Sequence, residues 1–196
     1  VALAPLSADG TAGSEISEAH GITGEILVSA PHVKDRYDRL WITEAHSSSL
    51  PGWHRTGDVG HFDADGRLWV EGRLGHVLTT PAGPLTPVAA EQAAESVPAV
   101  RLAALVGVGP AGTQVPVAVV ETVGGARRPG PAEDSLAADV RSAVAERCGL
   151  DLAAVLVLPQ MPTDIRHNSK IDRSALGAWA ARVLAGGRIT APGARR

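Results

Sequence analysis

The sequence has few aromatic residues and almost no cysteine. Aromatic residues make up 3% of its 196 residues, so a stacking platform for single-stranded nucleic acid is not expected. Cys148 is the single cysteine, which excludes a disulfide framework and a cysteine-rich zinc site. The net charge is −3 and no long basic run occurs, so neither nucleic acid nor an anionic membrane is expected as a partner.

Long apolar runs are also lacking. No stretch approaches the roughly 18 apolar residues of a membrane span, and Val1–Ala4 has no basic lead or apolar core typical of a signal peptide. A cytoplasmic location is therefore expected, which the single cysteine also fits. A chain that starts at Val1 rather than Met suggests a fragment of a longer protein.

The first 70 residues read as β-rich. Gly24–Val28 predicts a strand that leaves a glycine turn, and Asp65-Gly66 between two alternating segments predicts a hairpin. Beyond residue 74 the pattern alternates between helix and strand, which predicts a small α+β domain. The expected helices are Pro87–Ser96, Ala132–Cys148 with Gly149 as its stop, and Ile171–Ala185 with Asp172 as N-cap; the expected strands are Arg101–Val108, Val115–Glu121 and Val155–Leu158; Pro162–Lys170 is expected to be a polar loop.

Arg55–Asp58 contains a Thr-Gly-Asp tripeptide, which in most sequences is only a tight turn. Here Trp53 precedes it, and the predicted hairpin that follows delivers the chain to Gly72-Arg73. A lysine, Lys170, stands on the polar segment before the last predicted helix. Each of these motifs alone is weak evidence for a function, whereas their order along the chain is much more specific.

This ordered set resembles the second half of the adenylate-forming superfamily, which comprises acyl-CoA synthetases, nonribosomal-peptide adenylation domains and luciferases. The resemblance extends from Gly24 to the last helix. It implies that residues 1–72 are the β-rich C-terminal subdomain of a large AMP-binding domain, that 73–75 is a hinge, and that 76–188 is a small mobile α+β domain. Residues 189–196 are expected to be a disordered tail.

The resemblance also implies residue roles. Asp58 would accept hydrogen bonds from the ribose diol, with Thr56 and Arg73 beside the nucleotide. Lys170 would bridge the substrate carboxylate and the α-phosphate, and His167 is a further candidate site residue. The alternatives are a surface arginine that closes a hairpin and a solvated lysine on a loop.

The segment Asp164–Ile171 is similar to the corresponding motif of the olefin-pathway β-lactone synthetases. That likeness implies adenylation of a β-hydroxy fatty acid, whose own hydroxyl then displaces AMP and closes a four-membered ring without CoA. The acyl-CoA synthetase alternative would act on a fatty or aromatic acid. The loop Leu78–Pro84 has no lysine and contains two prolines, unlike the acyl-CoA synthetase pattern, which puts thioester formation in doubt. Gly75 suits a hinge because glycine is permissive in backbone torsion.

A third possibility is a non-catalytic interaction module, against which the joint presence of Asp58, Arg73 and Lys170 argues. The histidines show no metal-ligand spacing, so no protein-held metal site is predicted. No glycine-rich phosphate loop with lysine occurs, so ATP with Mg²⁺ would be bound mainly by an upstream N-terminal domain. The isolated chain is therefore expected to be inactive; its expected partners are that domain and a carboxylic acid substrate.

Overall fold

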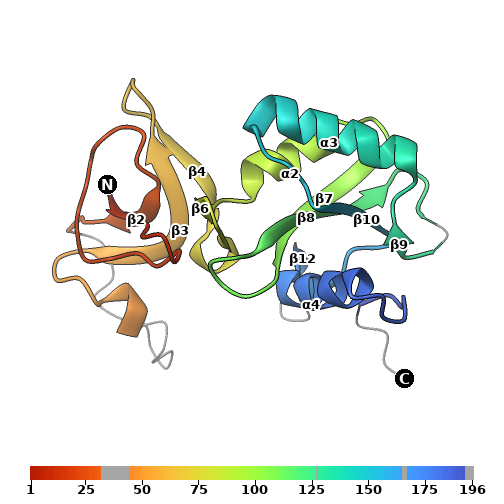
Figure 1. Cartoon of the computed structure of the whole chain (residues 1–196). Helices are drawn as coiled ribbons and strands as arrows, with labels where there is room; N and C mark the ends of the chain where they lie inside the picture. Colours follow the sequence, from red (N-terminus) through yellow and green to blue (C-terminus); the bar gives the residue numbers. More distant parts are fainter. Residues whose placement is uncertain (32–44, 127, 165–166, 193–196) are drawn as a thin grey trace. The chain divides into compact units, whose positions relative to one another are not determined.

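A computed structural model of the chain describes residues 1–31, 45–126, 128–164 and 167–192. The chain forms two compact units, Val1–Val77 and Leu78–Arg196 (Figure 1). The predicted domain boundaries and the hinge at 73–75 stay predictions.

The first unit is built on a four-stranded antiparallel sheet in the order β1-β2-β3-β4. Its buried side chains include Val59 of β3 and also Leu3 and Leu27, which point to opposite faces because Leu3 pairs with Ile26 and Leu27 with Ala2. A short 3-10 helix, η1 (Leu74–His76), follows the last strand. The strands are β1 (Ala2–Pro5), β2 (Gly24–Val28), β3 (His54–Phe62) and β4 (Leu68–Arg73).

The hairpin predicted at Asp65-Gly66 is confirmed as the connection between β3 and β4. Asp63 organises this turn: its carboxylate accepts hydrogen bonds from the Trp69 indole N–H and from the backbone N–H groups of Arg67 and Asp65. These donors hold the pKa of Asp63 below its ordinary value. The turn is thus fixed by one acidic side chain of the type that favours such positions.

The second unit has a four-stranded sheet in the order β7-β8-β10-β9, with β7 antiparallel and β10 parallel to β8. Helices α2 and α3 cover one face and α4 covers the other (Figure 1). Two short hairpins, β5–β6 and β11–β12, complete the unit. The bounds are β5 (Leu78–Thr80), β6 (Gly83–Leu85), α2 (Val88–Glu95), β7 (Val100–Val108), β8 (Val115–Thr122), β9 (Gly130–Pro131), α3 (Asp134–Cys148), β10 (Ala154–Leu158), β11 (Thr163–Asp164), β12 (His167–Ile171) and α4 (Arg173–Leu184).

The two-faced sheet follows from the sequence pattern of its strands. Successive residues of a strand point to opposite faces, so the apolar runs of β7, β8 and β10 supply side chains to both. Leu105 and Val120 pack with α2 and α3, whereas Val119 and Leu156 pack with α4 and its fully buried Trp179. A near-continuous apolar run is what a sheet covered on both faces requires.

The structure confirms two residues that were predicted to end or begin a helix. Gly149 ends α3 in the left-handed conformation with φ of 61°, as its predicted role as a stop requires. The Asp172 carboxylate accepts a hydrogen bond from Ala175 N–H at 2.9 Å, which confirms Asp172 as an N-cap. The α+β fold class is likewise confirmed.

Two predicted loops were wrong. The segment expected to be a polar loop over Pro162–Lys170 contains the antiparallel pair β11–β12, and Ile171 ends β12 rather than starting the helix. Leu78–Pro84 belongs to the β5–β6 hairpin. Both pairs are short and lack an alternating apolar pattern, so the hydrophobic period could not reveal them.

The predicted disordered tail falls partly outside the described residues. The chain over 189–192 is irregular, and 193–196 are not described. Within the described part of the chain, no helix has the length and apolar character needed to cross a membrane.

Shortening Leu156 tests the core beneath α4. Leu156→Ala should lower the free energy of unfolding by about 2–5 kcal/mol, because the side chain is fully buried and its loss leaves a cavity. Urea unfolding followed by circular dichroism measures the change. The exposed Leu184→Ala is the control and should shift stability by no more than about 0.5 kcal/mol. Equal shifts for the two variants would contradict the packing described for this face.

Candidate active site

Thr56 lies within β3, in a stretch where the register with β2 is irregular, and it helps to present Asp58. Its hydroxyl donates a hydrogen bond to the Ile26 carbonyl at 2.9 Å and accepts one from Asp58 N–H at 3.0 Å. Gly57 between them has φ of 73°, a conformation that favours glycine. The hydroxyl of Thr56 is thus engaged by the backbone, and the residue orients Asp58 within β3.

Glu25, on β2, bonds the same stretch of β3, the Thr-Gly-Asp segment Thr56–Asp58. Its carboxylate has no exposed surface and accepts three hydrogen bonds: from Arg55 Nε at 2.8 Å, from Gly57 N–H at 3.0 Å and from His46 Nε2 at 2.7 Å when that nitrogen carries the proton. Three donors satisfy a buried carboxylate that would otherwise be very costly. Glu25 therefore ties β2 to the Thr-Gly-Asp segment of β3.

Arg55 completes this buried network. Its other guanidinium nitrogens donate to the carbonyls of Gly13 and Ala12 at 3.0 and 2.8 Å, and the residue is only 7% exposed. Sequence reasoning missed Glu25 as a support for the Thr-Gly-Asp segment. The available signal was a single charged residue within the otherwise apolar strand Gly24–Val28.

Asp58 and Arg73 are direct partners on neighbouring strands. They face each other in the register of β3 and β4, and Arg73 Nη1 donates to Asp58 Oδ1 at 2.9 Å. The two side chains are 37% and 56% exposed, so the pair is open to solvent. A carboxylate and a guanidinium at this opening provide acceptors for hydroxyl groups and donors for phosphate oxygens.

Gly75, the predicted hinge residue, lies within η1. Its φ is not in the left-handed region, and a Cβ added there would meet nothing within 4 Å. The conformation described here therefore does not require glycine at this position. Its hinge role depends on a second conformation and stays a prediction.

Lys170 lies on β12 with its side chain exposed, in the second unit. The base of its hairpin is closed by a hydrogen bond from Asp172 N–H to the Pro162 carbonyl at 2.9 Å. His167 lies on the same strand, but its side chain is outside the described part of the structure. Thr56, Asp58 and Arg73 thus gather in one unit and Lys170 belongs to the other.

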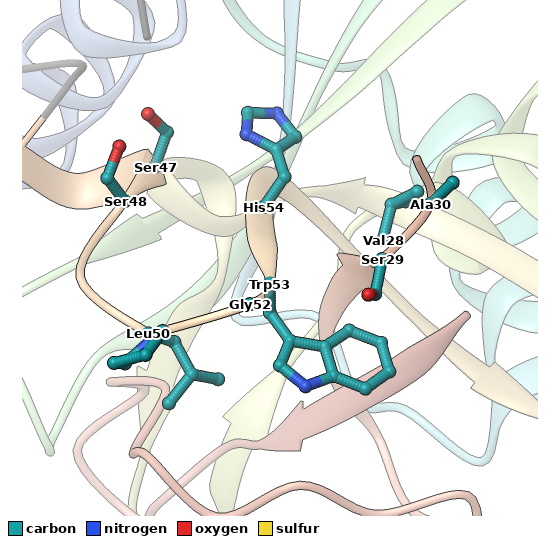
Figure 2. A pocket seen from close by; sticks show the side chains of 10 residues that line it. Val28, Ser29, Ala30, Ser47, Ser48, Leu50, Gly52, Trp53 and His54 are labelled. Atoms are coloured by element: carbon teal, nitrogen blue, oxygen red, sulfur yellow. The ribbon is translucent and has the colours of Figure 1, made fainter. Parts of the chain in front are cut away.

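A cavity of about 300 Å³ lies in the first unit (Figure 2). Trp53 and Leu50 line it together with Ser29 at the end of β2. None of the six predicted site residues lines this cavity. Among the described residues, no group of three or more His, Cys, Asp or Glu side chains could hold a metal ion.

Comparison with known proteins shows which proteins the chain is similar to. The chain is 40% identical over 174 residues to an olefin β-lactone synthetase of Stenotrophomonas maltophilia; the match covers 85% of this chain and 31% of that protein. It is 37% identical over 89 residues to an indoleacetate–CoA ligase of Aromatoleum aromaticum, covering 44% of this chain and 17% of the ligase. No family model matches.

Among solved structures, the amide bond synthetase McbA from Marinactinospora thermotolerans superposes with a TM-score of 0.68 at 26% identity. The superposition covers 91% of this chain and 34% of McbA. The chain is therefore a homologue of adenylate-forming ligases, and its fold matches their C-terminal domain. Within that class it is homologous over most of its length to olefin β-lactone synthetases, of which it spans about a third.

Replacing Glu25 tests the hydrogen bonds that join it to Arg55 and to the Thr-Gly-Asp segment of β3. Glu25→Gln should lower the free energy of unfolding by about 3–5 kcal/mol, because the nearly buried Arg55 then loses its charged partner. Denaturant unfolding measures the loss. His46→Ala is the matched control: its side chain is 45% exposed, so removing this one donor should cost about 1 kcal/mol or less. A Glu25→Gln protein as stable as the parent would contradict the description.

Proposed function

We propose that this chain is the C-terminal portion of an ATP-dependent ligase that activates a carboxylic acid as acyl-AMP, and that the acid is a β-hydroxy fatty acid closed to a β-lactone. The observation that carries the proposal is the ion pair between Asp58 and Arg73 in a chain that also presents an exposed Lys170. The 40% identity to an olefin β-lactone synthetase supports the acid and the product.

In the proposed first step a carboxylate oxygen attacks the α-phosphorus of ATP. A phosphorus–oxygen bond forms, the bond between the α- and β-phosphates breaks, and pyrophosphate leaves. Asp58 accepts hydrogen bonds from the ribose hydroxyls, with Arg73 beside the phosphate and Thr56 orienting Asp58. Lys170 brings a positive charge to the negative charge that develops as pyrophosphate departs.

In the proposed second step the substrate's own β-hydroxyl attacks the acyl carbon. A carbon–oxygen bond closes the ring, AMP leaves as the bond between the acyl carbon and the phosphate oxygen of the mixed anhydride breaks, and the hydroxyl proton is lost. A tethered nucleophile needs no second substrate, because its effective concentration is already high. His167 remains a candidate site residue for this chain.

The proposed enzyme needs residues that this chain does not carry. An N-terminal domain upstream would supply the phosphate loop and most of the acyl pocket. Residues 1–72 would belong to that large domain, with a swivel at 73–75 moving the small domain. Mg²⁺ would accompany ATP, and because no described cluster of side chains fits a metal ion, no step is assigned to the metal through this chain.

An acyl-CoA synthetase is the second candidate. The identity of 37% to an indoleacetate–CoA ligase over 89 residues favours it. The β5–β6 hairpin, without lysine and with Pro81 and Pro84, favours the lactone-forming reading instead. The two candidates share the first step and differ in the nucleophile of the second.

Removing the lysine charge tests the first step. Lys170→Ala in the full-length enzyme should reduce acyl-adenylate formation about 100-fold or more, as expected for the loss of a charge partner in the transition state. Pyrophosphate release under single-turnover conditions measures the rate. Arg182→Ala, which removes a cation from the last turn of α4, is the control and should keep the parent rate. An unchanged rate in Lys170→Ala would refute the assignment.

The second step is tested with defined substrates. The full-length enzyme, ATP and a 2-alkyl-3-hydroxy acid should yield a β-lactone in the absence of CoA, since the nucleophile belongs to the substrate. Mass spectrometry of the product identifies the lactone, and the same acid without its 3-hydroxyl should stop at acyl-AMP. Product that forms only when CoA is added would exclude the lactone-forming proposal and support the acyl-CoA synthetase.

A further inference from the structure

The segment that carries Lys170 is attached to the second unit at two points. At its start, Met161 N–H donates a hydrogen bond to Glu121 Oε2 at 3.0 Å. Glu121 is buried on β8 and is also paired with Arg101. At its end, Arg173 opens α4 and forms an ion pair with Glu91 of α2. The hairpin with Lys170 lies between these two points.

The Glu91–Arg173 pair is bidentate. Arg173 Nη2 donates to Glu91 Oε2 at 2.9 Å, and Arg173 Nη1 donates to Glu91 Oε1. The two side chains are only 11% and 18% exposed, so solvent screens the pair weakly. Two parallel hydrogen bonds fix the orientation of a guanidinium as well as its distance.

The pair also forms hydrogen bonds with the backbone of β7. Glu91 Oε1 accepts a hydrogen bond from Leu105 N–H at 2.7 Å, and Arg173 Nη1 donates to the Leu105 carbonyl at 3.3 Å. β7 lies at one edge of the described sheet, so these backbone groups are available to side chains. Arg173 therefore joins α4 to both α2 and the sheet, although α2 and α4 lie on opposite faces (Figure 1).

Arg173 stands three residues after Lys170. Between them, Ile171 is packed against the core beneath α4, and Asp172 both caps that helix and closes the hairpin through Pro162. No flexible spacer separates the ion pair from Lys170, because strand β12 runs directly into the helix cap. Arg173 and Lys170 are therefore joined by two residues that are each held by contacts within the unit.

We propose that Glu91 and Arg173 are positioning residues for Lys170: their ion pair fixes where the lysine strand leaves the small domain. This inference rests on the proposed adenylation role of Lys170. Displacement of a catalytic group by about 1 Å can cost on the order of 100-fold in rate. An ion pair that sets the strand therefore acts on the chemical step without touching substrate.

The test compares two glutamates of one helix. Glu95 lies one turn after Glu91 on α2 and likewise accepts a backbone hydrogen bond from the edge of β7, from Ala103 N–H at 2.9 Å. Glutamine at either position keeps an oxygen acceptor for that backbone bond. Glu91→Gln alone removes the charge that holds Arg173, so Glu95→Gln controls for a lost charge on α2.

In the full-length enzyme, Glu91→Gln should lower kcat for adenylate formation about 10-fold or more while KM for ATP changes less than about twofold. Glu95→Gln should keep both parameters near the parent values. Arg173→Lys keeps the charge but loses the bidentate contact, and should show an intermediate kcat. Equal losses in Glu91→Gln and Glu95→Gln, or a parent kcat in Glu91→Gln, would overturn the inference.

Hydrogen exchange separates this inference from the proposed function. The Asp172 amide, which closes the hairpin, should exchange faster in Glu91→Gln than in Glu95→Gln. Unchanged exchange would overturn the positioning role whatever the kinetics. A Lys170→Ala enzyme that keeps the parent rate would instead defeat the proposed catalytic lysine while the exchange result stood. If Glu91→Gln does not fold, Arg173→Lys takes its place. A lower kcat and a faster Asp172 exchange than in Glu95→Gln would support the inference, and parent values of both would overturn it.

Discussion

A carboxylate withdrawn from water must be met by hydrogen-bond donors, and this requirement organises both units. Glu25 accepts hydrogen bonds from Arg55 and from the Gly57 N–H at the Thr-Gly-Asp segment of β3. In the second unit, Glu121 holds the chain at Met161, and Glu91 holds it at the start of α4. In each case an acidic side chain from a strand or helix of the core fixes a backbone segment that carries a candidate site residue. Of the candidate site residues, Arg73 and Lys170 are exposed and Asp58 is partly exposed, so these three side chains are open to solvent.

The two units carry different candidate site residues. The first unit presents an acidic acceptor beside a guanidinium, and the second presents an ammonium group on a short hairpin. Asp58 and Arg73 are bonded to each other within the first unit, and a hydrogen bond within the second unit closes the hairpin that carries Lys170. The homology to adenylate-forming ligases gives this arrangement its chemical context.

Local signals in the sequence predicted most of the elements. Glycine in the left-handed conformation at 149 and an aspartate N-cap at 172 act over a single turn, so their residue types suffice to place helix ends. The β11–β12 pair could not be predicted this way, because contacts distant in sequence, such as Met161 with Glu121, hold its base. Glu25 was missed for the same reason: its donors come from residues 21 to 32 positions away. Candidate site residues were found by family resemblance, whereas the residues that support them required the fold.

Two glutamates of α2, Glu91 and Glu95, also cover the edge strand β7. Its N–H groups at Ala103 and Leu105 are already bonded to Glu95 and Glu91. An extended chain from another molecule that approached this strand would have to displace two carboxylates before it could extend the ladder. The same side chains that brace the unit thus guard it against self-association through intermolecular β-pairing, a common origin of insoluble aggregates.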